Sequence, residues 1–192
     1  MLSDQELMQQ TAAGDLQAFA ALVERYRERL ERFLYRLSGD REEAADCAQE
    51  ALVKLWLRRR EYRPQAQFTT YLYTIARHVW LDRAKRERRR PPVTPLEAQL
   101  GPAGRAMLER LVGEAAPVEA EVMRRYQVHR VRRAMQGLSE KHRTVFILSH
   151  FEDLSHEQIA EIVGASVGTV KSRMHYALVH LRRALQEEEQ LT

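Results

Sequence analysis

Apolar residues recur every three or four positions near both ends of the chain, and this spacing predicts amphipathic helices rather than strands. Ser3 and Glu6 have the spacing of a capping box, Asp40 can cap a later helix, and Pro64 ends that helix. Three apolar stripes follow one another in the first 90 residues: Phe19, Leu22, Val23, Tyr26, Leu30, Phe33, Leu34 and Leu37; Ala44, Cys47, Ala48, Ala51, Leu52, Leu55 and Trp56; and Phe68, Tyr71, Leu72, Ile75, Val79 and Leu81.

The middle of the chain interrupts the helical pattern. Five of the six prolines and three of the eight glycines lie between residues 91 and 117. Proline removes a backbone donor and disfavours helix in the residue before it. The stretch therefore predicts a flexible linker with one short helix near residues 105–112. We expect an all-α fold of two small helical domains, at 1–90 and 123–186, joined by a linker at 91–122.

The C-terminal block ends in the pattern of a helix-turn-helix. Ser155 and Gln158 have capping spacing at the start of one helix, and Gly164 suits a left-handed stop at its end. A second helix, capped by Ser166 or Thr169, has a predicted buried stripe of Val170, Met174, Leu178 and Leu181. Its other face is polar and basic, as entry into a DNA major groove requires; it holds Lys171, Ser172, His175 and Tyr176. The alternative is an ordinary helical hairpin with a solvated basic face.

Positive charge is concentrated in two stretches. The 192 residues have a net charge of +4, but residues 77–90 sum to +5 and residues 166–183 to +4, so the rest of the chain sums to −5. Aromatic residues precede the first basic stretch, at Phe68, Tyr71, Tyr73 and Trp80. Aromatic rings beside arginines suit a surface that stacks unpaired bases and binds phosphates. A solvated helix end followed by a basic tail is the alternative.

Several classes of protein are excluded by composition. No run approaches the roughly 18 apolar residues of a membrane-spanning helix, and the first ten residues lack a secretory pattern. A single cysteine, Cys47, cannot form an internal disulfide, so we expect a cytoplasmic protein in which this thiol is a buried small apolar residue. No spacing of histidine, cysteine or carboxylate residues matches a metal site or a catalytic pair. We expect no cofactor and no enzyme activity.

Four segments, in order along the chain, resemble the bacterial RNA polymerase sigma factors of the extracytoplasmic-function (ECF) group. DQELMQQTAAGDLQAFAALVERY resembles the opening helices of the family's second conserved domain, and REEAADCAQEALVKLW its polymerase-binding helix. FTTYLYTIARHVWLDRAKRERRR resembles the promoter-melting region, and residues 138–185 resemble the fourth domain. Tyr71 stands where the family usually has Trp, and His78 where it often has Asn, which leaves the contact to a flipped base open.

The resemblance implies three groups of binding residues. Core RNA polymerase would bind Asp46, Gln49, Glu50, Leu52 and Trp56. Promoter melting would involve Tyr71, Tyr73, Arg77, His78, Trp80, Arg83, Lys85 and Arg86. The upstream promoter element would contact Ser166, Thr169, Lys171, Ser172, Arg173, His175 and Tyr176.

The resemblance also implies the partners: core RNA polymerase, promoter DNA and an anti-sigma factor, with no membrane insertion by the chain itself. The chain would then direct promoter-specific initiation. The alternative is a stand-alone helix-turn-helix regulator whose N-terminal block senses a ligand or dimerises. That alternative has no need of the basic stretch at 77–90.

Overall fold

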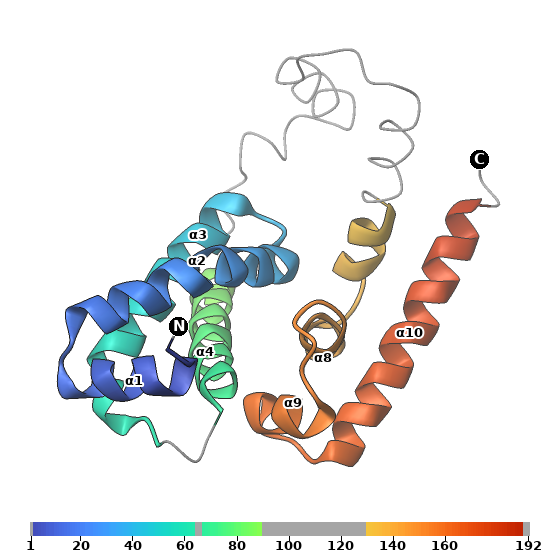
Figure 1. Ribbon diagram of the computed structural model, residues 1–192. Helices are drawn as coiled ribbons and strands as arrows, with labels where there is room; N and C mark the ends of the chain where they lie inside the picture. The colour runs from blue at the N-terminus through green and yellow to red at the C-terminus, as the bar shows by residue number, and fades with distance from the viewer. Residues whose placement is uncertain (1, 64–66, 90–129, 190–192) are drawn as a thin grey trace, which may run out of the picture.

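The computed structural model describes residues 2–63, 67–89 and 130–189, and every regular element in these ranges is helical (Figure 1). The elements are α1 (Asp4–Ala13), α2 (Leu16–Ser38), α3 (Arg41–Leu57), the 3-10 helix η1 (Arg59–Glu61), α4 (Phe68–Arg89), α8 (Glu140–His150), α9 (His156–Val163) and α10 (Val167–Glu189). A further helical segment occupies residues 130–136. The all-α class is confirmed. The predicted linker, its boundaries and the short helix at 105–112 lie outside the described residues.

Polar side chains cap the starts of α1, α2, α3 and α9, and left-handed glycines end α1, α2 and α9, because the first backbone N–H groups and last C=O groups of a helix lack partners within it. Ser3 and Glu6 form the predicted capping box, and Asp40 caps α3 by accepting the Glu43 N–H at 2.9 Å. Ser155 caps α9 in a second capping box, and Gly164 ends it at φ 62°. These local predictions are confirmed.

The described residues fall into an N-terminal half (up to residue 89) and a C-terminal half (from residue 130). In the N-terminal half, α2 packs between α1 and α3, and α4 packs on α3. Six of the eight residues of the predicted stripe on α2 are buried, Phe19 and Val23 are partly buried, and each buried Leu or Phe contributes about 1.5–3 kcal/mol. In the C-terminal half, α8, α9 and α10 pack on one another around Ile147, Leu148, Ile159 and Val170.

The two halves touch directly. Helix α9 packs on α4, and α8 packs on α2, so the buried apolar residues of both halves form one continuous cluster. Figure 1 shows the three C-terminal helices beside the N-terminal helices, with α9 next to one end of α4. We call this the closed arrangement. None of the described helices is long and apolar enough to cross a membrane.

One predicted core position is wrong. Leu178 is 48% exposed, whereas its neighbour Ala177 is fully buried. A helix turns by about 100° per residue. The buried stripe that starts at Val170 and passes through Met174 therefore continues to Ala177, seven residues after Val170, and not to Leu178, eight residues after it. Alanine fills that position because α8 packs closely on α10.

The difference in exposure between Leu178 and Leu181 on α10 is testable. Replacing Leu181, which is 7% exposed, by Ala should lower the free energy of unfolding by about 2–4 kcal/mol, because it removes buried methyl groups and leaves a cavity. Leu178→Ala should change it by less than about 1 kcal/mol. Urea unfolding followed by circular dichroism measures both, and equal losses would contradict the exposure of Leu178.

Candidate nucleic-acid interface

The turn between α9 and α10 fixes the start of the predicted recognition helix. Gly164 takes the left-handed conformation, and Ala165 donates its N–H to the Ala160 carbonyl at 3.0 Å. Ser166 accepts the Thr169 N–H at 3.1 Å, and the two hydroxyl oxygens lie 2.9 Å apart. Ser166 and Thr169 of the predicted upstream group therefore organise the beginning of α10.

The rest of the predicted upstream group lies on α10 itself. Lys171, Ser172, His175 and Tyr176 are all exposed, and Tyr176 is 60% exposed. Arg173 is half-buried. Residues 166–183 contain no acidic residue, so no carboxylate of that stretch offsets these cations; the acidic residues of α10 lie at its C-terminal end, at 187–189. The structure thus presents a basic helix face with one long aromatic side chain on it.

The predicted promoter-melting group on α4 divides into exposed and covered residues. His78, Lys85 and Arg86 are exposed, whereas Arg77, Trp80 and Tyr71 are half-buried. Tyr71 donates its hydroxyl to the Arg58 carbonyl at 3.0 Å. Arg77 Nε and Trp80 Nε1 are buried and have no hydrogen-bond partner among the described residues.

Tyr73, also in that group, has no exposed surface in the closed arrangement. Its ring is 0% exposed and packs edge-on against Phe33 at 5.0 Å between centroids. Its hydroxyl donates to Glu152 of the other half. The alternation of aromatic and basic residues could not reveal the partner of the hydroxyl, because Glu152 lies 79 positions away. In this arrangement Tyr73 presents no surface to DNA.

Arg83 joins α4 to α3. Its guanidinium lies 3.5 Å from a carboxylate oxygen of Glu43, 3.3 Å from one of Asp46 and 3.9 Å from one of Glu87. A residue predicted to contact DNA and a residue predicted to contact polymerase are therefore an ion pair with each other. In this position Arg83 is held within the N-terminal half.

The outer face of α3 differs from the prediction in its apolar members. Asp46 and Gln49 are exposed, Glu50 pairs with Lys54 at 2.8 Å, and Trp56 is half-buried. Leu52 is only 8% exposed and belongs to the core. The exposed apolar residues are Val53 (50%) and Leu57 (69%), seven and eleven positions after Asp46 and so on the same helix face. Counting helical positions from Asp46 identifies them, whereas hydrophobicity alone does not.

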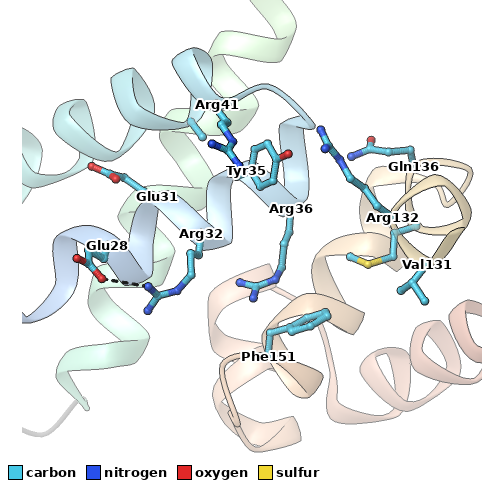
Figure 2. Close-up of a pocket in the computed structure, with 12 residues that line it drawn as sticks. Glu28, Glu31, Arg32, Tyr35, Arg36, Arg41, Val131, Arg132, Gln136 and Phe151 are labelled. Carbon is cyan, nitrogen blue, oxygen red and sulfur yellow. Dashed lines mark hydrogen bonds and ion pairs between the residues drawn. The ribbon is translucent and has the colours of Figure 1, made fainter. Parts of the chain in front are cut away.

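A groove of about 850 Å³ separates the two halves on one side (Figure 2). Figure 2 shows Arg36 of α2 directed at the ring of Phe151, with 4.1 Å from the guanidinium carbon to the ring centroid. Arg132 lies over the Tyr35 ring at 4.5 Å. The groove contains no cluster of metal-ligating side chains, and the described residues elsewhere hold none either.

Comparisons with known families match both halves. Residues 22–90 match Sigma-70 region 2, and residues 129–181 match Sigma-70, region 4. The chain is 32% identical over 181 residues to the ECF RNA polymerase sigma factor SigW of Bacillus subtilis, covering 94% of this chain and 95% of that protein. It is 34% identical over 186 residues to the RNA polymerase sigma-H factor of Pseudomonas aeruginosa, covering 95% and 94%. It is 33% identical over 181 residues to the ECF sigma-E factor of Escherichia coli K12, covering 92% and 91%.

Two solved structures share the fold. CnrH in complex with the cytosolic domain of CnrY superposes with a TM-score of 0.70 at 21% identity, covering 96% of this chain and 97% of that one. RpoE in complex with the anti-sigma factor NepR from Bartonella quintana gives 0.65 at 22% identity, covering 89% and 98%.

Cys47 lies next to Asp46 and is fully buried, as predicted, and burial raises the pKa of its thiol from 9.0 to about 11. A raised thiol pKa means that the neutral form persists until the pH approaches 11. At pH 8 the reactive thiolate is then about a hundredfold scarcer than for an ordinary cysteine. Iodoacetamide should therefore alkylate Cys47 at least a hundredfold more slowly than a Cys47→Ala, Ala45→Cys chain, in which the thiol sits at an exposed position. Similar rates would contradict this environment.

Proposed function

The chain belongs to the ECF group of bacterial RNA polymerase sigma factors, and we propose that its three exposed faces divide the work of transcription initiation. The family matches to both regions, in order, carry this conclusion. Relatives that match over more than nine-tenths of their own length favour a sigma factor over a stand-alone helix-turn-helix regulator. The chain recognises the promoter, and the polymerase catalyses RNA synthesis. None of the chain's own residues is therefore assigned a catalytic role.

The upstream promoter element is read by α10. Lys171 and Arg173 donate to guanine edges or phosphates, Ser172 to phosphates, and His175 and Tyr176 extend furthest from the helix face. Ser166 and Thr169 hold the start of the helix at the groove. The exposure of this acid-free face supports the assignment.

The downstream element is opened by α4. Exposed His78, Lys85 and Arg86 attract the phosphate backbone, and Tyr71, Tyr73 and Trp80 supply rings for bases that leave the stack. Arg77 and Arg83 complete the basic side of the helix. The unpartnered Nε atoms of Arg77 and Trp80 support a role in binding, because buried donors without partners are costly unless function retains them.

The polymerase binds the outer face of α3. Asp46, Gln49 and Glu50 supply the polar part of that face, and Trp56 lies at its edge. Val53 and Leu57 replace Leu52 as its apolar part, since only exposed apolar residues gain from burial in an interface. The domains are sigma region 2 at 1–90 and sigma region 4 at 123–186, with a linker at 91–122, and the chain acts in the cytoplasm, where polymerase and DNA meet.

An anti-sigma factor holds the chain inactive. The fold shared with the sigma factor RpoE, which was solved in complex with the anti-sigma factor NepR, supports this partner. The groove between the halves is lined by arginines and by the apolar residues Phe151 and Met135. It therefore gives such a partner an amphipathic surface.

The test is transcription reconstituted from core polymerase and this chain on a library of promoter fragments. We expect initiation from a defined promoter set, with Lys171→Ala weakening promoter binding by the holoenzyme about tenfold, because one base or phosphate contact is worth about 1–3 kcal/mol. Arg27→Ala removes an exposed cation of α2 outside the three faces and serves as the matched control. No selectivity above core polymerase alone would reject the proposal, and equal effects of the two substitutions would reject the assignment of α10.

The α3 face gives a separate prediction. Leu57→Gln should weaken binding of core polymerase about tenfold, because a central apolar interface residue typically costs more than 1 kcal/mol when lost. Leu16→Gln changes an equally exposed leucine (66%) on α2 and should leave the affinity unchanged. Competition for core polymerase against a fluorescently labelled wild-type chain measures both affinities.

A further inference from the structure

The groove between the two halves is lined by four arginines and only two glutamates (Figure 2). Both glutamates already have partners. A carboxylate oxygen of Glu28 lies 3.2 Å from a guanidinium nitrogen of Arg32, and one of Glu31 lies 3.0 Å from Arg27 Nε, which is outside the groove. The carboxylates of the lining are therefore engaged on α2 and do not neutralise the other arginines of the groove.

Two of those other arginines, Arg41 of α3 and Arg132 of the segment 130–136, flank one aromatic ring. Their guanidinium carbons lie 5.7 Å and 4.5 Å from the ring centroid of Tyr35, and Figure 2 shows the ring between them. Neither arginine pairs with a carboxylate among the residues that the structure describes. Arg132 donates to the Gly39 carbonyl, which leaves most of its N–H groups available.

The three groups at Tyr35 suit an anion. Two guanidinium groups held beside one ring repel each other, and a carboxylate bound to both offsets that repulsion. Hydrogen bonds from a charged donor to a carboxylate are roughly twice as strong as those between neutral groups. The Tyr35 hydroxyl has no hydrogen-bond partner within the described ranges, so it offers the same anion a third donor.

The remaining surface of the groove is apolar and mainly aliphatic. Val131 is 37% exposed although it is apolar, and Met135 lies beside it in the lining. Guanidinium groups already stack on both aromatic rings of the groove, with the guanidinium carbon of Arg36 4.1 Å from the ring centroid of Phe151. The surface left for a ligand therefore suits a flexible hydrocarbon chain, to which the unbranched side chain of a methionine adapts readily.

We propose that the groove is a binding site for a small amphiphilic anion, a carboxylate carried on an unbranched hydrocarbon chain. The carboxylate contacts Arg41, Arg132 and the Tyr35 hydroxyl, and the chain lies along Val131 and Met135. The volume of about 850 Å³ falls within the roughly 300–1,000 Å³ of small-molecule sites.

This site goes beyond the roles proposed for α3, α4 and α10 and does not depend on them. Its ligand occupies surface that an anti-sigma factor would also contact, so the ligand and such a partner exclude each other from the groove. The ligand touches both halves of the chain, because Arg41 and Tyr35 belong to one half and Arg132 and Val131 to the other.

Isothermal titration calorimetry of the full chain with decanoate measures the binding. We expect one decanoate per chain. Each buried methylene should strengthen binding about fourfold, so hexanoate, which has four fewer methylenes, should bind at least tenfold more weakly. Decyltrimethylammonium has a hydrocarbon chain of the same length and a cationic head, which the guanidinium groups repel, and it should also bind at least tenfold more weakly than decanoate.

Substitutions distinguish this site from adsorption elsewhere on the chain. Arg41→Gln should weaken decanoate binding about tenfold, because it removes a charged donor. Tyr35→Phe keeps the ring, removes only the hydroxyl and should weaken binding about fivefold. Arg60→Gln removes an exposed arginine of η1 outside the groove and should leave the affinity within twofold. Circular dichroism of each variant checks that it is folded.

Three results overturn the site. The first is the absence of saturable decanoate binding, and the second is equal affinity of the wild type, Arg41→Gln and Tyr35→Phe. The third is tighter binding of hexaglutamate than of decanoate, which would make the groove a site for an acidic protein segment. None of these measurements uses polymerase or DNA, so failure here leaves the proposed function in transcription standing.

Discussion

A carboxylate with almost no solvent exposure needs compensating charge, and Glu152 finds it in the other half of the chain. Removing an ion of this size from water costs several kcal/mol even after the protein relaxes. Arg29, Arg36 and the Tyr73 hydroxyl supply the compensation, and all three come from α2 and α4. The position of the C-terminal helices against the N-terminal helices combines this charge pairing with the packing of one continuous apolar cluster.

The same arrangement explains why charge is segregated along the chain. Arg77 of α4 feels the positive charge of Arg173 on α10, and Glu140 of α8 opposes that effect. The outer face of α3 carries acidic and apolar residues. Arg83 connects it to α4 through Asp46, so the surface assigned to polymerase and the helix assigned to DNA share an ion pair.

Local features could be predicted from the sequence, and features set by distant residues could not. The capping boxes at Ser3 and Ser155 and the left-handed Gly164 depend on residues within four positions, and all are confirmed. Leu52 and Val53 differ in exposure because of how α3 packs, and hydrophobicity alone does not distinguish them; counting helical positions from the exposed Asp46 does. The hydrogen-bond partner of the Tyr73 hydroxyl is a glutamate in the other half. The binding roles of the three faces stay predictions, because they depend on molecules outside the chain.

Glu152 lies far along the sequence from its partners, and this separation has a consequence for biosynthesis. Tyr73 precedes Glu152 by 79 residues and Arg29 precedes it by 123. At a translation rate of about 5–20 residues per second, the ribosome needs roughly 4–16 s to reach the glutamate after it has made the tyrosine. During that interval the helices of the N-terminal half can fold before Glu152 is available to bind Arg29, Arg36 and Tyr73. Each newly made chain therefore passes through a period in which α4 is uncovered, before the last helices exist to close over it.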